Sequence, residues 1–240
     1  MRVRKLASLI ALSLALASAP ALAAENIDKV FGSITAEAGK EYGSLESVNG
    51  GITVREGAVV RSASTVNGGI SIGDRARVGS AETVNGGISL GEGASARSLE
   101  AVNGGISLDA NASVEEDVET VNGGIRLKRG ARVGGDVETV NGGITLTAAE
   151  VAGGLVTTHG DITLEEGSTV RGGILVEKPN SSWWNGNNRK PRVVIGPNST
   201  VGGNLVFEHP VELLVHSTAK IGPVTGATAQ AYTDKLPPRE

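Results

Sequence analysis

The sequence predicts an all-β protein, a single-stranded right-handed parallel β-helix, or β-solenoid, of about ten rungs with 18 or 19 residues each. A motif, Val-Asn-Gly-Gly-Ile, recurs at nearly constant spacing, as in repeat architectures. Its copies begin at Val48, Val66, Val84, Val102, Val121 and Val140, so that the spacing is 18 in the first three steps and 19 in the last two. Composition agrees, because glycine makes up 35 of 240 residues and aromatic residues only 2%. Small aliphatic side chains suit the thin layers of a coil.

Each repeat contains three short apolar steps. After the motif at Val66, aliphatic residues recur about every six positions, at Ile70–Ile72, Val78 and Val84. Runs such as Ile-Ser-Ile alternate apolar and polar residues, as half-buried strands do. Asn-Gly is a strong turn signal because both residues tolerate positive φ. Each repeat therefore predicts three short strands joined by three corners, which together form one rung.

Weaker copies extend the series in both directions. They begin at Val30 and Thr158, each one repeat length from the nearest full copy, and the pattern resumes at Ile195 after an interruption. We expect ten rungs between Val30 and about Val224, a rod of roughly 48 Å at about 4.8 Å per rung. Residues 24–225 are thus predicted to form the solenoid, with an inserted loop at 177–192. Residues 226–240 are predicted to be a flexible C-terminal tail.

Residues 1–23 have the pattern of a secretory signal peptide. Arg2, Arg4 and Lys5 form a basic start, an apolar run covers Leu6–Ala17, and Ala21-Leu22-Ala23 supplies small residues for cleavage. The apolar run is shorter than the roughly 20 residues that span a bilayer. The sequence therefore predicts an exported chain of the periplasm or outer envelope, with no transmembrane segment after cleavage.

Composition also excludes several kinds of function. The chain has no cysteine, so disulfides and thiolate chemistry are excluded. If residues 1–23 are removed, 19 of the 22 basic residues remain against 26 acidic ones. An acidic chain with scattered basic residues is not expected to bind nucleic acid. No motif predicts a cofactor.

The asparagines of the motif predict a column along the coil. Asn-Gly is what a tight corner demands, so we interpret the column as a structural ladder of stacked amides. A ligand groove lined by amides is the alternative. The members are Asn49, Asn67, Asn85, Asn103, Asn122 and Asn141.

Acidic residues recur two positions before the marker valine. If the rungs stack in register, neighbouring carboxylates lie about 5 Å apart, where like charges raise pKa values. A solvated acidic face is the simpler interpretation, and a row of calcium sites is the weaker alternative. The members are Glu46, Glu82, Glu100, Glu119 and Glu138, of which the last four are the metal candidates.

The predicted loop at 177–192 holds both tryptophans of the chain. Indole rings stack on sugars and amides pair with hydroxyl groups, so the loop is a candidate glycan-binding site. The alternative is that the rings cover an apolar patch of the solenoid. The candidate residues are Trp183, Trp184, Asn185, Asn187 and Asn188.

An enzyme is the rival class, because β-helix proteins include polysaccharide-cleaving enzymes with paired carboxylates. In this chain every acidic pair follows from the repeat. The three histidines, His159, His209 and His216, occupy unrelated positions of their rungs. We therefore expect no catalytic residues.

Three segments carry resemblances to known families. Ile72–Gly79 and Ile195–Gly203 resemble the bactofilins, and the Val-Asn-Gly-Gly-Ile-Thr-Val segment at Val48 is similar to adhesin β-helix families. The bactofilin resemblance implies a right-handed, three-faced, polymer-forming cytoplasmic scaffold, and the signal peptide departs from that location. The adhesin resemblance implies an envelope protein. Hexapeptide acyltransferases also step by six residues, so a left-handed hexapeptide β-helix is the alternative fold.

Together these observations predict a non-catalytic solenoid of a Gram-negative cell envelope. Its expected role is structural or adhesive, through end-to-end self-association or contact with an envelope polysaccharide. A polysaccharide-active enzyme is the alternative.

Overall fold

The computed structural model describes residues 24–179 and 189–239. Within these ranges the chain forms 28 β-strands and no helix, and every strand pair is parallel. Paired residues of neighbouring strands are mostly one repeat length apart in the chain, as with Asn49 and Asn67. The predicted β-solenoid is confirmed, with eleven turns in place of about ten.

The coil is built from two parallel sheets. The 11-stranded sheet contains β2 (Ile34–Ala36), β4 (Ile52–Val54), β6 (Ile70–Ile72), β8 (Ile88–Leu90), β10 (Ile106–Leu108), β13 (Ile125–Leu127), β16 (Ile144–Thr147), β19 (Ile162–Glu165), β22 (Arg192–Ile195), β25 (Glu212–His216) and β28 (Ala229–Tyr232). The 17-stranded sheet contains β1 (Glu25–Phe31), β3 (Glu41–Asn49), β5 (Val59–Asn67), β7 (Arg77–Asn85), β9 (Ser95–Asn103), β11 (Ser113–Val114), β12 (Val118–Thr120), β14 (Arg132–Val133), β15 (Val137–Thr139), β17 (Glu150–Val151), β18 (Leu155–Thr157), β20 (Thr169–Val170), β21 (Ile174–Val176), β23 (Thr200–Val201), β24 (Leu205–Phe207), β26 (Lys220–Ile221) and β27 (Val224–Thr225).

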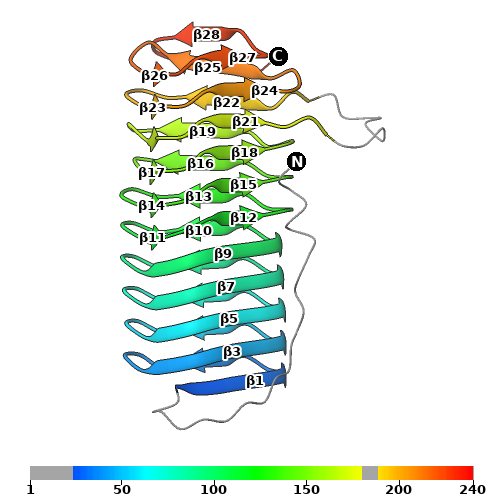
Figure 1. Cartoon of the computed structure of the whole chain (residues 1–240), viewed down its shortest axis with the longest axis vertical. Coiled ribbons are helices and arrows are strands. Elements are labelled where there is room, and N and C mark those ends of the chain that lie inside the picture. Colours follow the sequence, from blue (N-terminus) through cyan, green and yellow to red (C-terminus); the bar gives the residue numbers. More distant parts are fainter. Residues whose placement is uncertain (1–23, 180–188, 240) are drawn as a thin grey trace.

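The coil is right-handed. In Figure 1 the long strands β3 to β9 run from left to right in front, the short strands run from right to left behind them, and the chain rises towards its C-terminus. This is the hand that twisted strands favour in parallel crossovers. The expected right-handed form therefore holds over the left-handed hexapeptide alternative.

Half-way along the coil, the single long strand that each rung contributes to the larger sheet is replaced by two short strands. Up to β9, one long strand covers two of the three predicted faces without a break. In the next rung Val114 pairs with Ala96 and keeps the earlier spacing, but Val118 pairs with Leu99, so the spacing has lengthened by one position. The extra residue between Val114 and Val118 divides the strand into β11 and β12. The longer repeat thus interrupts the strand between β11 and β12.

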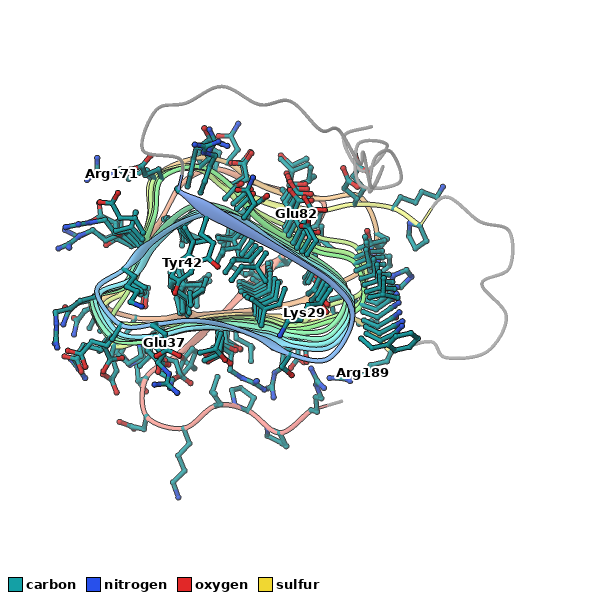
Figure 2. The ribbon with its side chains drawn as sticks, turned by 90° about the horizontal axis from the view of Figure 1, so that it is seen from below. Lys29, Glu37, Tyr42, Glu82, Arg171 and Arg189 are labelled. Carbon is teal, nitrogen blue, oxygen red and sulfur yellow. The ribbon has the colours of Figure 1, made fainter. Side chains whose placement is uncertain are left out.

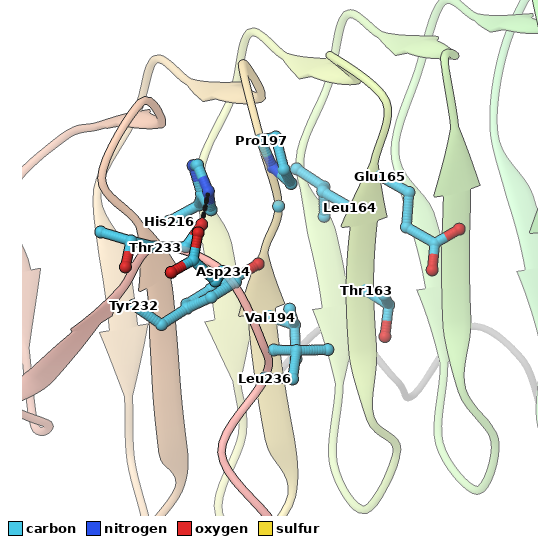
Figure 3. A pocket seen from close by; sticks show the side chains of 11 residues that line it. Thr163, Leu164, Glu165, Val194, Pro197, His216, Tyr232, Thr233, Asp234 and Leu236 are labelled. Carbon is cyan, nitrogen blue, oxygen red and sulfur yellow. Dashed lines mark hydrogen bonds between the residues drawn. The ribbon is translucent and has the colours of Figure 1, made fainter.

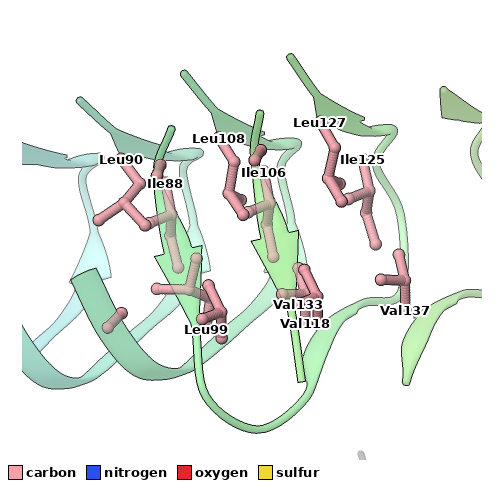
Figure 4. Packing of buried hydrophobic residues seen from close by; sticks show 14 of the residues in the cluster. Ile88, Leu90, Leu99, Ile106, Leu108, Val118, Ile125, Leu127, Val133 and Val137 are labelled. Carbon is pink, nitrogen blue, oxygen red and sulfur yellow. The ribbon is translucent and has the colours of Figure 1, made fainter. Parts of the chain in front are cut away.

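The core is a set of aliphatic stacks along the coil axis (Figure 4). Isoleucine and leucine of the short strands lie above the same residues of neighbouring rungs, as with Ile88, Ile106 and Ile125, which are at most 2% exposed. The opposite sheet contributes Leu99 and Val118, each 0% exposed. Every rung buries its apolar residues against two neighbours, so stability accumulates along the rod.

The turn that follows each short strand from β2 to β22 contains at least one residue in the left-handed conformation. Glycine adopts it without a Cβ penalty in several rungs, whereas other rungs use a residue with a side chain. The glycines are Gly39, Gly57, Gly93, Gly130 and Gly167, and the other residues are Arg75, Asn111, Ala148, Glu166 and Asn198.

The C-terminal segment differs from the predicted flexible tail at 226–240. Its strand β28 pairs with β25 and adds a further strand to the smaller sheet. Tyr232 then packs on Val194 and Leu214, and its ring meets His216 edge-on at 5.1 Å between centroids. Arg239 forms an ion pair of 2.5 Å with Asp161. β28 itself extends the smaller sheet, and the chain after it lies near that sheet, where Leu236 and Val194 line the same cavity.

In the described ranges no helix is long and apolar enough to cross a membrane.

Candidate functional site

Three parallel columns of outward-facing residues lie on the larger sheet, at the C-terminal ends of β3, β5, β7 and β9 and on and just after β12 and β15. We call this surface the column face, and it spans the rungs of the full Val-Asn-Gly-Gly motif. The carboxylate column contains Glu46, Ser64, Glu82, Glu100, Glu119 and Glu138. The valine column contains Val48, Val66, Val84, Val102, Val121 and Val140, and the amide column contains Asn49, Asn67, Asn85, Asn103, Asn122 and Asn141. Figure 2, seen along the coil axis, shows the stacked side chains, with Glu82 outside the ribbon.

The amide column is a continuous hydrogen-bonded ladder. Asn67 Nδ2 donates to Asn49 Oδ1 at 2.9 Å, and Asn85 donates to Asn67 at 2.9 Å. The next three steps repeat the bond at 2.9–3.0 Å, between Asn103 and Asn85, Asn122 and Asn103, and Asn141 and Asn122. The predicted structural ladder is confirmed. It fixes the height of each corner relative to the next.

The glycines of the corner are required for close packing between rungs. A Cβ on Gly68 would lie 2.3 Å from the carbonyl oxygen of Gly50, and a Cβ on Gly86 would lie 2.1 Å from that of Gly68. Neither glycine has a positive φ, and neither does the preceding asparagine. The expectation of a positive-φ turn is therefore wrong. The motif uses glycine because backbone stacks directly on backbone at this corner.

Threonine supports the same corner from inside the coil. Thr83 is 1% exposed, and its Oγ1 donates to the carbonyl oxygen of Gly68 at 2.8 Å. Thr65, Thr120 and Thr139 make the same bond to Gly50, Gly104 and Gly123 at 2.8–2.9 Å. This is why a polar residue is tolerated in the core. The sequence pattern alone does not single out these threonines, although Thr precedes the marker valine in most copies.

The carboxylates of the carboxylate column stack at the spacing of the strands. Glu82 pairs with Glu100, Glu100 with Glu119, and Glu119 with Glu138. Neighbouring backbones in such a sheet lie about 4.8 Å apart. The stack therefore places four carboxyl groups side by side.

Burial, together with the stacking that the repeat spacing predicts, disfavours the charged forms of these carboxyl groups. Burial, with the neighbouring charges of Glu138 and Glu100, raises the pKa of Glu119 from 4.5 to about 7. Burial and the charges of Glu82 and Asp117 raise the pKa of Glu100. At neutral pH the column thus holds fewer negative charges than its composition suggests.

The calcium hypothesis for this column gains no support. Among the described residues, no three His, Cys, Asp or Glu side chains converge as a metal site would require. The nearby aspartates accept hydrogen bonds from backbone N–H groups of the next rung. Asp117 Oδ1 accepts one from the Asp136 N–H at 2.8 Å, and Asp136 Oδ1 accepts one from the Gly154 N–H at 2.7 Å.

All three columns change composition after the rung of Asn141. The carboxylate column continues as Val156, Leu175 and Val206. The amide position is taken by His159, whose pKa is lowered by burial and by the nearby His209. The column face therefore has a defined end.

The tryptophan loop is only partly described. Trp183, Trp184, Asn185, Asn187 and Asn188 lie outside the described residues. The described chain resumes at Arg189. Both Arg189 and Arg192 contact Asp161. The Arg189 guanidinium pairs with that carboxylate at 2.6 Å, and the Arg192 backbone N–H donates to it at 2.8 Å.

One cavity of about 280 Å³ lies between the C-terminal segment and the smaller sheet (Figure 3). Val194, Tyr232 and Leu236 line it together with Glu165 and Asp234. His216 Nε2 bonds the carbonyl oxygen of Thr233 at 2.7 Å and holds the segment over the cavity. The cavity is small and belongs to the end of the rod, away from the column face.

Comparison with known proteins found no matching family model, no matching curated protein and no matching solved structure.

Proposed function

We propose that this chain is an exported, non-catalytic β-solenoid with a structural or adhesive role in the bacterial cell envelope. The column face carries the proposal. It repeats one arrangement of carboxylate, valine and amide in five of its six rungs, with Ser64 in place of the carboxylate in the other, and a hydrogen-bonded ladder holds the rungs in register. A surface that repeats at a fixed spacing suits a partner that also repeats. Such partners are an envelope polysaccharide or another copy of the chain.

At the N-terminal end of the rod, end-to-end association is less favoured than contact through the side of the rod. Lys29 pairs with Ser47, whose side chain is 4% exposed and faces the core, so Lys29 occupies an inward position of the first rung. Its Nζ donates to the carbonyl oxygen of Ser33 at 2.9 Å, and Figure 2 shows Lys29 within the outline of the ribbon. Inward-pointing charges protect sheet edges against pairing. Contact through the side of the rod fits this arrangement better.

A polysaccharide-active enzyme is the second candidate. It is favoured by one observation, the raised pKa of Glu119 between two neighbouring carboxylates. Glycosidases use such a carboxylic acid beside a carboxylate. The stacked repeat explains the same shift without catalysis, so the two functions have to be separated by experiment.

The test uses the chain from Ala24 onwards with insoluble peptidoglycan. We expect it to sediment with the polymer or to self-associate in sedimentation velocity, and to release no soluble sugar. The double variant Glu82→Lys, Glu100→Lys should weaken the interaction. The matched variant Ser71→Lys, Ser89→Lys on the opposite sheet should not.

A chain that neither sediments with the polymer nor self-associates would contradict the proposal. Release of soluble sugar that is lost in Glu119→Gln would establish the enzyme instead.

A further inference from the structure

We propose that the column face binds the column face of a second copy, so that two solenoids lie side by side and parallel. This inference rests on the proposed structural role and names its partner. The two copies are related by a two-fold axis that lies between them and runs parallel to both coil axes.

The order of the columns makes the face complementary to itself. Across each rung the order is carboxylate, valine, amide, as in Glu82, Val84 and Asn85. A two-fold rotation about the coil direction reverses this order in the second copy. Each carboxylate column then faces the partner's amide column, and the valine columns meet in the middle. Such an isologous contact uses the same patch twice.

The antiparallel arrangement lacks this complementarity. A two-fold axis across the rod would place carboxylate against carboxylate and amide against amide. The stacked carboxylates already raise one another's pKa within one copy, as at Glu100 and Glu119. A second carboxylate column would add further like charge at close range. Charge therefore favours parallel rods.

The amide ladder leaves hydrogen bonds for a partner. Each internal asparagine donates one N–H of its amide group to the ladder, as Asn85 does to Asn67. An amide group has two N–H donors, and an ionised carboxylate only accepts. The second N–H can therefore donate to a carboxyl oxygen of the other copy, because both the ionised and the protonated carboxyl group keep an acceptor oxygen.

The valine column supplies the apolar contact. Val66, Val84 and Val102 are partly exposed, and their side chains repeat at the spacing of the rungs. Both copies have the same spacing, so valines can meet at every rung without loss of register. An exposed apolar column of this kind is typical of an interaction surface.

The contact is small. Six rungs at about 4.8 Å and a width of about 10 Å give roughly 300 Å² per copy, against about 800 Å² in a standard interface. The pairing is therefore weak between isolated copies. It becomes effective where many copies are concentrated, for example on an envelope surface.

Disulfide trapping tests the arrangement, because the chain has no cysteine of its own. In parallel rods Val48 faces Val48 of the other copy, so Val48→Cys should form a disulfide-linked dimer under mild oxidation. We expect a rate at least roughly tenfold above that of Ser71→Cys, which lies exposed on the opposite sheet, a difference of about 1.4 kcal/mol. Adding Val84→Lys and Val102→Glu to Val48→Cys, which places opposite charges on neighbouring rungs, should reduce the rate to that of the control while the circular dichroism spectrum stays the same.

An antiparallel pair would give a different product. Val48 would then face Val140, so a mixture of Val48→Cys and Val140→Cys chains would yield mixed dimers instead of like dimers. That product, or a Val48→Cys rate equal to the control, would overturn the inference. Sedimentation with peptidoglycan in the same preparation would leave the proposed function standing, whereas loss of both would remove it too.

Discussion

Gly86 lies directly against the backbone of Gly68, so closely that a Cβ on Gly86 would stand 2.1 Å from the Gly68 carbonyl oxygen. The same contact recurs along the motif, for example between Gly104 and Gly86 at 1.9 Å. The obstacle is backbone, which cannot move aside as a flexible side chain can. The two rungs would have to separate to admit any side chain.

Gly86→Ala is therefore expected to destabilise the chain by about 3 kcal/mol, the upper range for overpacking. Asn85→Ala should cost about 1 kcal/mol, because it removes ladder bonds at an exposed site. Ser89→Ala, on an exposed position of β8, is the control and should change stability by less than about 0.5 kcal/mol. Urea unfolding followed by circular dichroism measures all three. Equal, small effects of Gly86→Ala and Asn85→Ala would contradict the packing argument.

Much of this architecture could be predicted from the sequence, because the repeat reports it directly. The spacing of Val-Asn-Gly-Gly-Ile predicted the stacking of Asn85 on Asn67 and of Glu100 on Glu82, and both are confirmed. The reason for the glycines was not predictable from composition. Close backbone approach and positive φ both demand glycine, and only the structure distinguishes them.

Other features could not be predicted, for definite physical reasons. Periodic aliphatic spacing does not reveal that Thr83 faces inward while Val84 faces outward. That arrangement depends on the bond from Thr83 to the Gly68 carbonyl oxygen. The strand β28 was missed because Ala229–Tyr232 belongs to no repeat and is positioned by Tyr232 packing on Val194 and Leu214.

The carboxylate column should make stability fall as pH rises. The folded chain raises the pKa of Glu119 from 4.5 to about 7. The folded state therefore binds more protons than the unfolded state between those values, and its stability declines as pH rises from about 4.5 to 7. Glu119→Gln removes this contribution. The variant should gain about 1 kcal/mol over the wild type at pH 8, a value reduced for solvent screening, and nothing at pH 4.

Thermal melts of both chains at pH 4 and pH 8 measure this difference. Ser89→Ala, at an exposed position with no titratable group, serves as the control and should give the same difference from wild type at both values. A Glu119→Gln effect that is independent of pH would show that neither burial nor the stacked carboxylates raise the pKa of Glu119 in the folded chain.

Ala148 offers a way to stabilise the coil. Its φ of 47° places a side chain in the left-handed conformation, where several other turns have glycine. Ala148→Gly should stabilise by about 0.5–1 kcal/mol, because relief of the strain exceeds the entropy lost by glycine. Ala152→Gly, at an exposed position without positive φ, should be neutral or destabilising. Thermal melts compare the two, and a lower melting temperature for Ala148→Gly would contradict the assignment.

Lys29 should determine whether the N-terminal end of the rod attracts another copy. Its backbone pairs with Ser47, so its position faces the apolar interior, while neighbouring Phe31 is 78% exposed. Lys29→Leu would turn this end into an uncharged, apolar sheet edge, the kind that recruits further strands. We expect the variant, beginning at Ala24, to associate end to end with rising concentration in sedimentation velocity and to form longer rods in electron micrographs. Lys40→Leu, on an exposed turn, is the control and should behave as the wild type does. If Lys29→Leu behaves as the control does, the lysine is not what keeps this end closed; if the wild type already forms rods end to end, the charge does not block stacking at all.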